Sequence, residues 1–291
     1  MTARDVDKNI EYLGDEEDIS ALARLHTAVV STLSPFIVGN QDLIELILIA
    51  LLAEGHILIE GLPGTAKTTI AKAIAMVTGC EFARIQGAVD LQPADMIGVR
   101  IYDQQSCEFN LRKGPIFTNV LLADEMNRVH PKAQSAFIEA MSERQATIDG
   151  ITLPVPRPFI VIATQNSFEL EGTFPLIEAQ RDRFMVSIGI SPLSPDEELS
   201  VIKRASDGTL TWNRFAETLR PVTSPDGLQA AIDRINPALP AAAQEEALRK
   251  ITRLGQPSLL LNNHTFHHFL IHGIEVDYKT PQGRMVSGRA F

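Results

Sequence analysis

The segment with the clearest chemistry is a glycine-containing turn between a short apolar run and a helical stretch. It reads Gly-Leu-Pro-Gly-Thr-Ala-Lys-Thr over residues 61–68 and follows the apolar run 56–60. In a strand-to-helix turn of this kind, successive backbone N–H groups can point at phosphate oxygens, and the helix N-terminus adds its positive dipole. Lys67 would reach the β- and γ-phosphates of a nucleotide, and the Thr68 hydroxyl would ligate Mg²⁺. The turn therefore predicts a site for ATP and Mg²⁺.

We expect the phosphate contacts to come from the whole turn and the start of its helix. The predicted nucleotide-binding residues are Gly61, Pro63, Gly64, Thr65, Ala66, Lys67, Thr68 and Thr69. Ala66 stands where glycine is usual before the lysine. Alanine fits there if this residue has ordinary helical dihedral angles; otherwise its Cβ strains the loop. For this segment alone, the alternative is a plain glycine-rich turn with a surface lysine.

A second apolar run ends in two adjacent carboxylates. Residues 120–125 read Val-Leu-Leu-Ala-Asp-Glu. In phosphate-loop ATPases the first acid at this place holds Mg²⁺, usually through water, and the second orients or activates the attacking water. An acid pair at a strand end is common by itself. Because this pair follows a phosphate loop in the right order, it predicts Asp124 for the metal and Glu125 for the water.

A polar amide follows the next apolar run. Residues 159–164 read Phe-Ile-Val-Ile-Ala-Thr and continue into Gln165 and Asn166. The carboxyl ends of parallel strands form the edge of a sheet where ligands bind. Asn166 alone would be a turn residue. As the third member of an ordered series, it is predicted to hydrogen-bond the γ-phosphate or the attacking water.

The elements that must position these groups alternate between strands and helices, which indicates an α/β fold with a parallel sheet flanked by helices. We expect strands at 56–60, 82–86, 119–123 and 159–164, and helices at 68–77 and 132–143. A hairpin is expected at 145–155, with its turn at Asp149 and Gly150. Residues 21–52 predict two helices, broken near Ser34, Pro35 and Gly39.

The composition is that of an ordinary globular protein, with 45% hydrophobic and 21% charged residues. Its 26 basic and 36 acidic residues give a net charge of −10, which disfavours generic nucleic-acid coating. The longest apolar run, 43–53, is too short to cross a bilayer, and the N-terminus lacks a secretory signal. Cys80 and Cys107 have no metal-ligand spacing. We therefore expect a cytoplasmic protein without a membrane or nucleic-acid partner.

With these residues in view, the chain resembles the MoxR branch of the AAA+ ATPases over about residues 35–228. The similar segments are 61–68, 114–128, 134–150, 159–166 and 171–184, in this order and at fitting distances. The resemblance implies a P-loop NTPase (AAA+) fold, an ATPase that uses Mg²⁺, and a ring oligomer, which is a hexamer in the family. It also implies chaperone-like remodelling or maturation of partner proteins, with a von Willebrand factor A domain protein as the candidate partner.

The resemblance also implies a residue that acts across a subunit boundary. The family's Glu-Ala-Gln-x-Asp-Arg-Phe stretch matches residues 178–184. Arg183 is therefore the expected catalytic arginine finger, which contacts the γ-phosphate held by a neighbouring subunit. Arg181 is the second candidate, and an intrachain salt bridge of Arg183 to Asp182 or Glu178 is the alternative. The hairpin at 145–155 resembles an insertion on the family's central face; a plain exposed hairpin is the alternative.

The resemblance divides the chain into four parts. Residues 1–20 are expected to be a loosely ordered acidic N-terminus, 21–190 the AAA+ ATPase core, and 191–228 the start of a helical lid. The family's Gly-Ala-Ser-Pro-Arg lid signature is missing, so the lid is expected to be incomplete or replaced. Residues 229–291 instead resemble part of the N-terminal region of the R subunit of type I restriction enzymes. We expect a small α+β tail with a helix at 241–254 and a hairpin at 273–286.

Two other functions stay open at this point. The tail could dock the chain to restriction machinery, which would make it a restriction-associated ATPase module. Alternatively, the missing lid arginine could leave a truncated protein that binds ATP through Lys67 and Thr68 without turnover.

Overall fold

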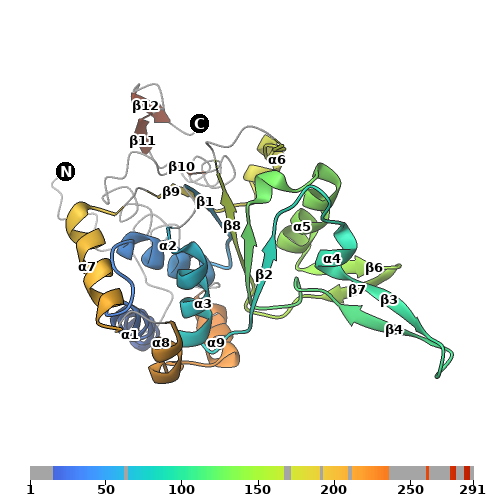
Figure 1. The fold of residues 1–291 in the computed structure, drawn as a ribbon, viewed down its shortest axis with the longest axis horizontal. Coiled ribbons are helices and arrows are strands. Elements are labelled where there is room, and N and C mark those ends of the chain that lie inside the picture. Colours follow the sequence, from blue (N-terminus) through green and yellow to red (C-terminus); the bar gives the residue numbers. More distant parts are fainter. Residues whose placement is uncertain are drawn as a thin grey trace.

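The computed structural model describes residues 16–61, 65–166, 172–190, 193–208 and 212–235 and three short strands at 260–261, 276–279 and 285–288. Within this part of the chain, the largest sheet has six strands in the order β10-β9-β1-β8-β5-β2 (Figure 1). They are β1 Ile57–Glu60, β2 Phe82–Gln86, β5 Val120–Asp124, β8 Ile160–Gln165, β9 Val186–Gly189 and β10 Leu260–Leu261. Every neighbouring pair is parallel except β10 with β9. The predicted α/β fold with a parallel sheet is confirmed.

The register of the sheet brings the ends of distant segments to one edge. Glu60 at the end of β1 pairs with Gln165 at the end of β8. Gln86 at the end of β2 pairs with Asp124 at the end of β5. The four predicted strands agree with the structure to within one residue at each end. Strand β9 is not predicted from the sequence, because its four residues include a serine and a glycine and so do not form a continuous apolar run.

Helices cover the sheet on both faces (Figure 1). They are α1 Glu16–Leu33, α2 Gln41–Leu52, α3 Lys67–Val77, α4 Pro93–Ile97, the 3-10 turn η1 Met126–Arg128, α5 Pro131–Glu143, α6 Glu178–Arg181, α7 Pro195–Ser206, α8 Trp212–Thr218 and α9 Pro225–Ile235. Because α1 begins at Glu16, residues 16–20 are helical, unlike the loosely ordered segment expected there; residues 1–15 lie outside the described residues. Among the helices described, none has the length and apolarity needed to span a bilayer.

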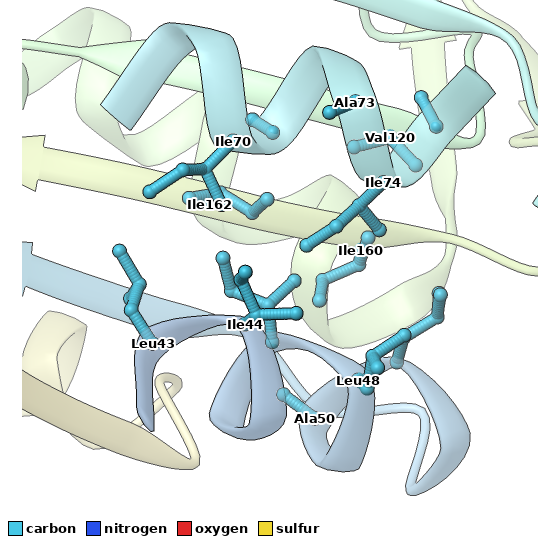
Figure 2. Close-up of a cluster of buried hydrophobic side chains, with 14 of the residues drawn as sticks. Leu43, Ile44, Leu48, Ala50, Ile70, Ala73, Ile74, Val120, Ile160 and Ile162 are labelled. Atoms are coloured by element: carbon cyan, nitrogen blue, oxygen red, sulfur yellow. The ribbon is translucent and has the colours of Figure 1, made fainter. Parts of the chain in front are cut away.

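The core of the described part of the chain has two hydrophobic clusters, one on each face of the sheet. Alternate side chains of one strand enter different clusters, as the pleat requires: Val120 and Leu122 of β5 belong to the first, and Leu121 and Ala123 to the second. The first cluster joins α1, α2 and α3 to the sheet, and the second joins α5 to its other face. Figure 2 shows part of the first cluster, where side chains of α2 and α3 meet those of β5 and β8.

Of the three helices that follow the sheet, α8 and α9 pack onto the first cluster, whereas α7 has no buried residue. Helix α7 begins with a capping box, in which the Ser194 N–H donates to the Glu197 carboxylate at 2.8 Å. The Phe215 ring of α8 stacks on Phe36, with ring centroids 3.8 Å apart. Leu228 and Ile232 of α9 are buried in the first cluster. Helix α9 therefore runs through the boundary expected at 228–229, and its buried residues pack with the core.

Within the described residues, three hairpins lie outside the main sheet. They are β3 Gly98–Asp103 with β4 Glu108–Lys113, β6 Gln145–Ile148 with β7 Ile151–Pro154, and β11 Val276–Lys279 with β12 Met285–Gly288. The second and third confirm the hairpins predicted at 145–155 and 273–286. The first is not predicted, and it extends from the same side of the molecule as the second (Figure 1). The helix expected at 241–254 lies outside the described residues.

Candidate nucleotide site

A cavity of about 390 Å³ lies at the carboxyl edge of the sheet. The predicted site residues that line it are Gly61, Thr65, Ala66, Lys67, Thr68, Thr69, Asp124, Glu125 and Asn166. Pro63 and Gly64 lie outside the described residues. Four further residues that the sequence analysis does not assign also line the cavity: Arg84, Gln86, Thr164 and Gln165. The fold thus brings groups from four separate strand ends and one helix start to one hollow.

Lys67 is the first residue of α3, and its side chain is nearly buried at 9% exposure. The Nζ donates to the Gly61 carbonyl at 3.2 Å and to the Thr65 hydroxyl at 3.1 Å. Burial lowers the pKa of Lys67, and the charges of Asp124 and Glu125 oppose that shift. Gly61 and Thr65 therefore hold the Lys67 ammonium group, and the carboxylates of Asp124 and Glu125 favour its charged form.

Ala66, directly before this lysine, has φ 58° and ψ 15°. These angles lie in the left-handed region, which costs a non-glycine residue about 1–2 kcal/mol. The condition for an unstrained alanine, ordinary helical dihedrals, is therefore not met. Strained backbone of this kind persists only where the surrounding structure holds it, and it is common in loops that bind ligands.

Asp124 ends β5 and has a protein donor at each carboxylate oxygen. The Thr164 hydroxyl donates to Oδ1 at 2.5 Å, and the Arg84 guanidinium donates to Oδ2 at 2.6 Å. The Thr164 oxygen also accepts the Glu125 N–H at 2.9 Å. Thr164 of β8 therefore fixes both acids of the pair relative to the neighbouring strand.

Glu125 leaves the strand in the left-handed region, with φ 54° and ψ 48°. Its Oε2 accepts a hydrogen bond from the Gln86 side-chain amide at 3.0 Å and lies 3.3 Å from the Arg128 Nε. Gly87, the residue after β2, lies close to the Glu125 backbone: a Cβ at Gly87 would lie 2.2 Å from the Glu125 carbonyl oxygen. Only a residue without a side chain lets the segment after β2 pass this near the acid pair.

Asn166 lies at the cavity just beyond β8, where its backbone is held by Asn127. The Asn127 amide donates to the Asn166 carbonyl at 3.2 Å, and the Asn166 N–H donates back to the Asn127 Oδ1 at 3.4 Å. This pair of hydrogen bonds fixes the position of the Asn166 backbone beside the acid pair.

The two arginines considered for the finger differ in their surroundings. The Arg181 Nη2 lies 3.2 Å from the Glu60 Oε1. Arg183 is exposed, and no ion pair joins it to another of the described residues. The salt bridge to Asp182 or Glu178 considered as the alternative is therefore not formed. Neither arginine lines the cavity of its own chain.

Four polar residues of the cavity are not predicted as site residues although their strands are predicted: Arg84, Gln86, Thr164 and Gln165. Arg84 and Gln86 lie two positions apart on β2, so they share one face of the strand, and Thr164 ends the apolar run of β8. A search for polar side chains in the last residues of every expected strand would have found them.

The donors present fit a nucleotide with Mg²⁺. The Thr68 hydroxyl and the Asp124 carboxylate line the same cavity, and both are oxygen ligands of the kind that Mg²⁺ prefers. Among the described residues, no three His, Cys, Asp or Glu side chains gather as a metal-ligand set. Mg²⁺ is usually held by one or two carboxylates together with substrate phosphates, and Asp124 can supply such a carboxylate.

A buried lysine at the start of the helix that follows β1, with an acid pair at the end of a strand two places away in the sheet, is typical of a phosphate-loop nucleotide site. The family model of the "ATPase family associated with various cellular activities (AAA)" matches residues 56–186. Residues 56–186 of this chain belong to that family and are of the MoxR type.

Similar proteins agree with this assignment. "Chaperone MoxR1" of Mycobacterium tuberculosis is 47% identical over 66% of this chain and 51% of its own length. "Uncharacterized protein YeaC" of Bacillus subtilis is 46% identical over 66% of this chain and 59% of its own length. The crystal structure of a candidate ATPase from Cytophaga hutchinsonii superposes with a TM-score of 0.68 at 39% identity, over 76% of this chain and 66% of that one. The chain thus spans between half and three fifths of these two curated relatives.

Proposed function

We propose that this protein binds ATP with Mg²⁺ and hydrolyses it to ADP and phosphate. The observation that carries the proposal is the meeting of Lys67, Thr68, Asp124 and Glu125 in one cavity at the carboxyl edge of a parallel sheet. Membership of the core in a family of ATPases supports it.

Each of these side chains has a separate role in the proposed reaction. The loop and Lys67 bind the β- and γ-phosphates, while Thr68 and Asp124 hold Mg²⁺, which supplies charge neutralisation at the phosphates. Glu125 orients a water molecule and takes its proton as the water oxygen bonds to the γ-phosphorus. The bond from that phosphorus to the bridging oxygen of ADP breaks in the same displacement. Asn166 positions the water or the γ-phosphate.

The site is completed by a neighbouring copy in a ring, for which a hexamer is the proposed form. Arg183 is exposed and has no ion pair with another described residue, so its guanidinium is available to a γ-phosphate held by another copy. Such an arginine finger offsets the charge of the transition state and raises the rate by about 10³–10⁵. A single subunit is therefore expected to hydrolyse ATP poorly.

The ATPase cycle serves to remodel partner proteins. A relative that shares 47% identity is named a chaperone, and the β3–β4 hairpin exposes Val99, Ile101, Tyr102, Phe109 and Leu111. Apolar side chains gathered on one projecting ribbon are typical of an interaction surface. A von Willebrand factor A domain protein is the proposed partner.

The experiment compares ATP binding and hydrolysis in the wild type, Glu125→Gln and Lys67→Ala. We expect Glu125→Gln to lower the hydrolysis rate by about 100-fold or more, because a general base contributes about 10²–10⁴, while ATP binding stays within about threefold of the wild type. Lys67→Ala should weaken binding about tenfold or more, because charge-assisted contacts to phosphate are lost.

The control is Glu143→Gln, which makes the same change of charge at an exposed position at the end of α5. It should leave binding and turnover unchanged. A Glu125→Gln protein that hydrolyses ATP like the wild type would refute the role of the acid pair.

A further inference from the structure

Asp124 is engaged by two protein donors at once, although the proposed function also assigns Mg²⁺ to it. Oδ1 accepts the Thr164 hydroxyl at 2.5 Å, and Oδ2 accepts the Arg84 guanidinium at 2.6 Å. The threonine hydroxyl is neutral, but the guanidinium carries a permanent positive charge. A cation that approaches Asp124 therefore meets a carboxylate whose charge is already paired.

The strand pairing explains why Arg84 reaches this carboxylate. Residue 84 pairs with Leu122, and Gln86 pairs with Asp124, in the parallel register of β2 and β5. Arg84 and Gln86 share one face of β2, and Arg84 also donates to the Gln86 side-chain oxygen. Gln86 in turn donates to Glu125 at 3.0 Å. Arg84 is thus connected to both acids of the pair.

The burial of the two partners is unequal. The Asp124 side chain is 15% exposed, whereas the Arg84 side chain is 44% exposed. The acid is fixed by β5 and Thr164, while the arginine has solvent on one side and can swing outward at small cost. When a second cation reaches the same carboxylate, the arginine is the partner that can yield.

We propose that Arg84 competes with Mg²⁺ for Asp124 and so sets the Mg²⁺ concentration at which the site takes up a magnesium nucleotide. Two cations a few ångströms apart repel each other, and the repulsion is strongest where water is partly excluded. Binding of Mg²⁺ must therefore weaken or displace the Arg84–Asp124 pair. Arg84 acts through Asp124 and is a positioning residue. This inference rests on the proposed function of the site.

The test measures nucleotide binding, not turnover. A fluorescent ADP analogue is titrated onto the full chain at a series of Mg²⁺ concentrations and, separately, in EDTA. The variants are Arg84→Gln, which removes the charge, and Arg84→Lys, which keeps it. The matched control is Arg112→Gln, the same substitution on the exposed strand β4.

We expect Arg84→Gln to lower the Mg²⁺ concentration for half-maximal binding about fivefold, the factor for a half-exposed charge pair. Arg84→Lys and Arg112→Gln should stay within about twofold of the wild type, because the charge at Asp124 is kept. In EDTA, Arg84→Gln should bind the analogue as the wild type does.

Two results would overturn the proposal while leaving the proposed function intact. One is a wild-type protein that binds the analogue with Mg²⁺ and an Arg84→Gln variant with the same Mg²⁺ dependence. The other is a loss of affinity of about tenfold in EDTA, which would make Arg84 a direct phosphate ligand. A wild-type protein that binds no nucleotide at any Mg²⁺ concentration would overturn the proposed function, and this inference with it.

Discussion

Asp124 and Glu125 are neighbours in the chain, yet different side chains hold them. Asp124 bonds to Thr164 and Arg84, whereas Glu125 bonds to Gln86 and lies beside Arg128. The left-handed backbone of Glu125 separates the two acids in direction and costs about 1–2 kcal/mol. Different surroundings for two adjacent carboxylates suit the separate roles proposed for them, one for the metal and one for the water.

Gly87 provides a test of how closely the acid pair must be placed. In Gly87→Ala the new Cβ would start 2.2 Å from the Glu125 carbonyl oxygen, so the backbone of Glu125 must shift. Because a displacement of about 1 Å at a catalytic group can lower a rate about 100-fold, we expect kcat for ATP hydrolysis to fall by about tenfold or more. Nucleotide affinity, which depends on the loop and Lys67, should change little. Steady-state kinetics and a binding titration measure both.

The control for this change is Gly227→Ala in α9, where the new Cβ would approach only the hydroxyl groups of Thr223 and Ser224. It should keep the wild-type kcat. If Gly87→Ala also keeps it, the close packing of β2 against the acid pair is not needed for catalysis.

Among single residues, the sequence predicts those whose roles follow from the residue type and from the order of the motifs along the chain. Lys67, Thr68, Asp124, Glu125 and Asn166 are predicted and line one cavity. Arg84 and Gln86 are not predicted, because their contacts depend on which strand lies beside β5. That neighbour is a property of the sheet order, which the sequence pattern does not contain. Whether Ala66 is strained could not be predicted, because the sequence does not fix its dihedral angles.

Among the elements, β1, β8 and α5 are joined below the site by one buried histidine. His56 precedes β1 and is 5% exposed. Its Nε2 donates to the Met141 carbonyl at 3.2 Å, and its Nδ1 accepts the Val161 N–H at 3.0 Å. This tautomer follows from its partners, one an acceptor and the other a donor. Protonation of Nδ1 would break the bond to β8.

His56 predicts how stability depends on pH. Burial lowers the pKa of His56 from 6.5 to about 4. The folded protein keeps this ring neutral where the unfolded chain binds a proton, so its contribution is complete above pH 6.5 and is lost as the pH falls towards 4. Between pH 7 and pH 5 the loss amounts to about 2 kcal/mol. Urea unfolding at both pH values measures it.

The comparison variant is His56→Gln, which replaces the imidazole with a side-chain amide that can donate and accept hydrogen bonds but does not titrate. It should be less stable than the wild type at pH 7 and should lose less stability between pH 7 and pH 5. An equal loss in both proteins would show that His56 is not the group responsible.

Continuous apolar runs predict the central strands of the sheet. Strands β1, β5 and β8 are apolar runs because both of their faces are covered, and they match the expected ranges closely. The β3–β4 hairpin is not predicted, although polar and apolar residues alternate over residues 108–112 of β4. Every residue of β4 is exposed, so this alternation does not mark a buried face. The pairing of Tyr102 with Phe109, with ring centroids 5.2 Å apart, becomes visible only in the structure.

For the molecule as a whole, α9 is the element that changes the expected organisation. It spans the boundary expected at 228–229; Leu228 and Ile232 are buried in the first cluster, and α9 contacts α1. Most of residues 236–291 lie outside the described part of the chain. The restriction-associated function and the incomplete lid therefore stay predictions from sequence.

In the proposed ring, Arg183 of one copy completes the nucleotide site of a neighbouring copy. The Glu125→Gln variant loses the proposed base but keeps Arg183. The Arg183→Ala variant loses the arginine finger but keeps Glu125. Each variant alone should be inactive. In a ring made from equal amounts of both, about a quarter of the interfaces would join an intact Glu125 to an intact Arg183.

The measurement that tests this account most directly is therefore the ATPase rate of the two inactive variants before and after mixing. We predict that mixing restores activity, up to about a quarter of the wild-type rate at equal amounts. We also predict that the specific activity of the wild type rises with protein concentration as rings form. If the mixture stays inactive while the wild type hydrolyses ATP at the same rate at every concentration, the site is complete within one chain and the shared-site account is wrong.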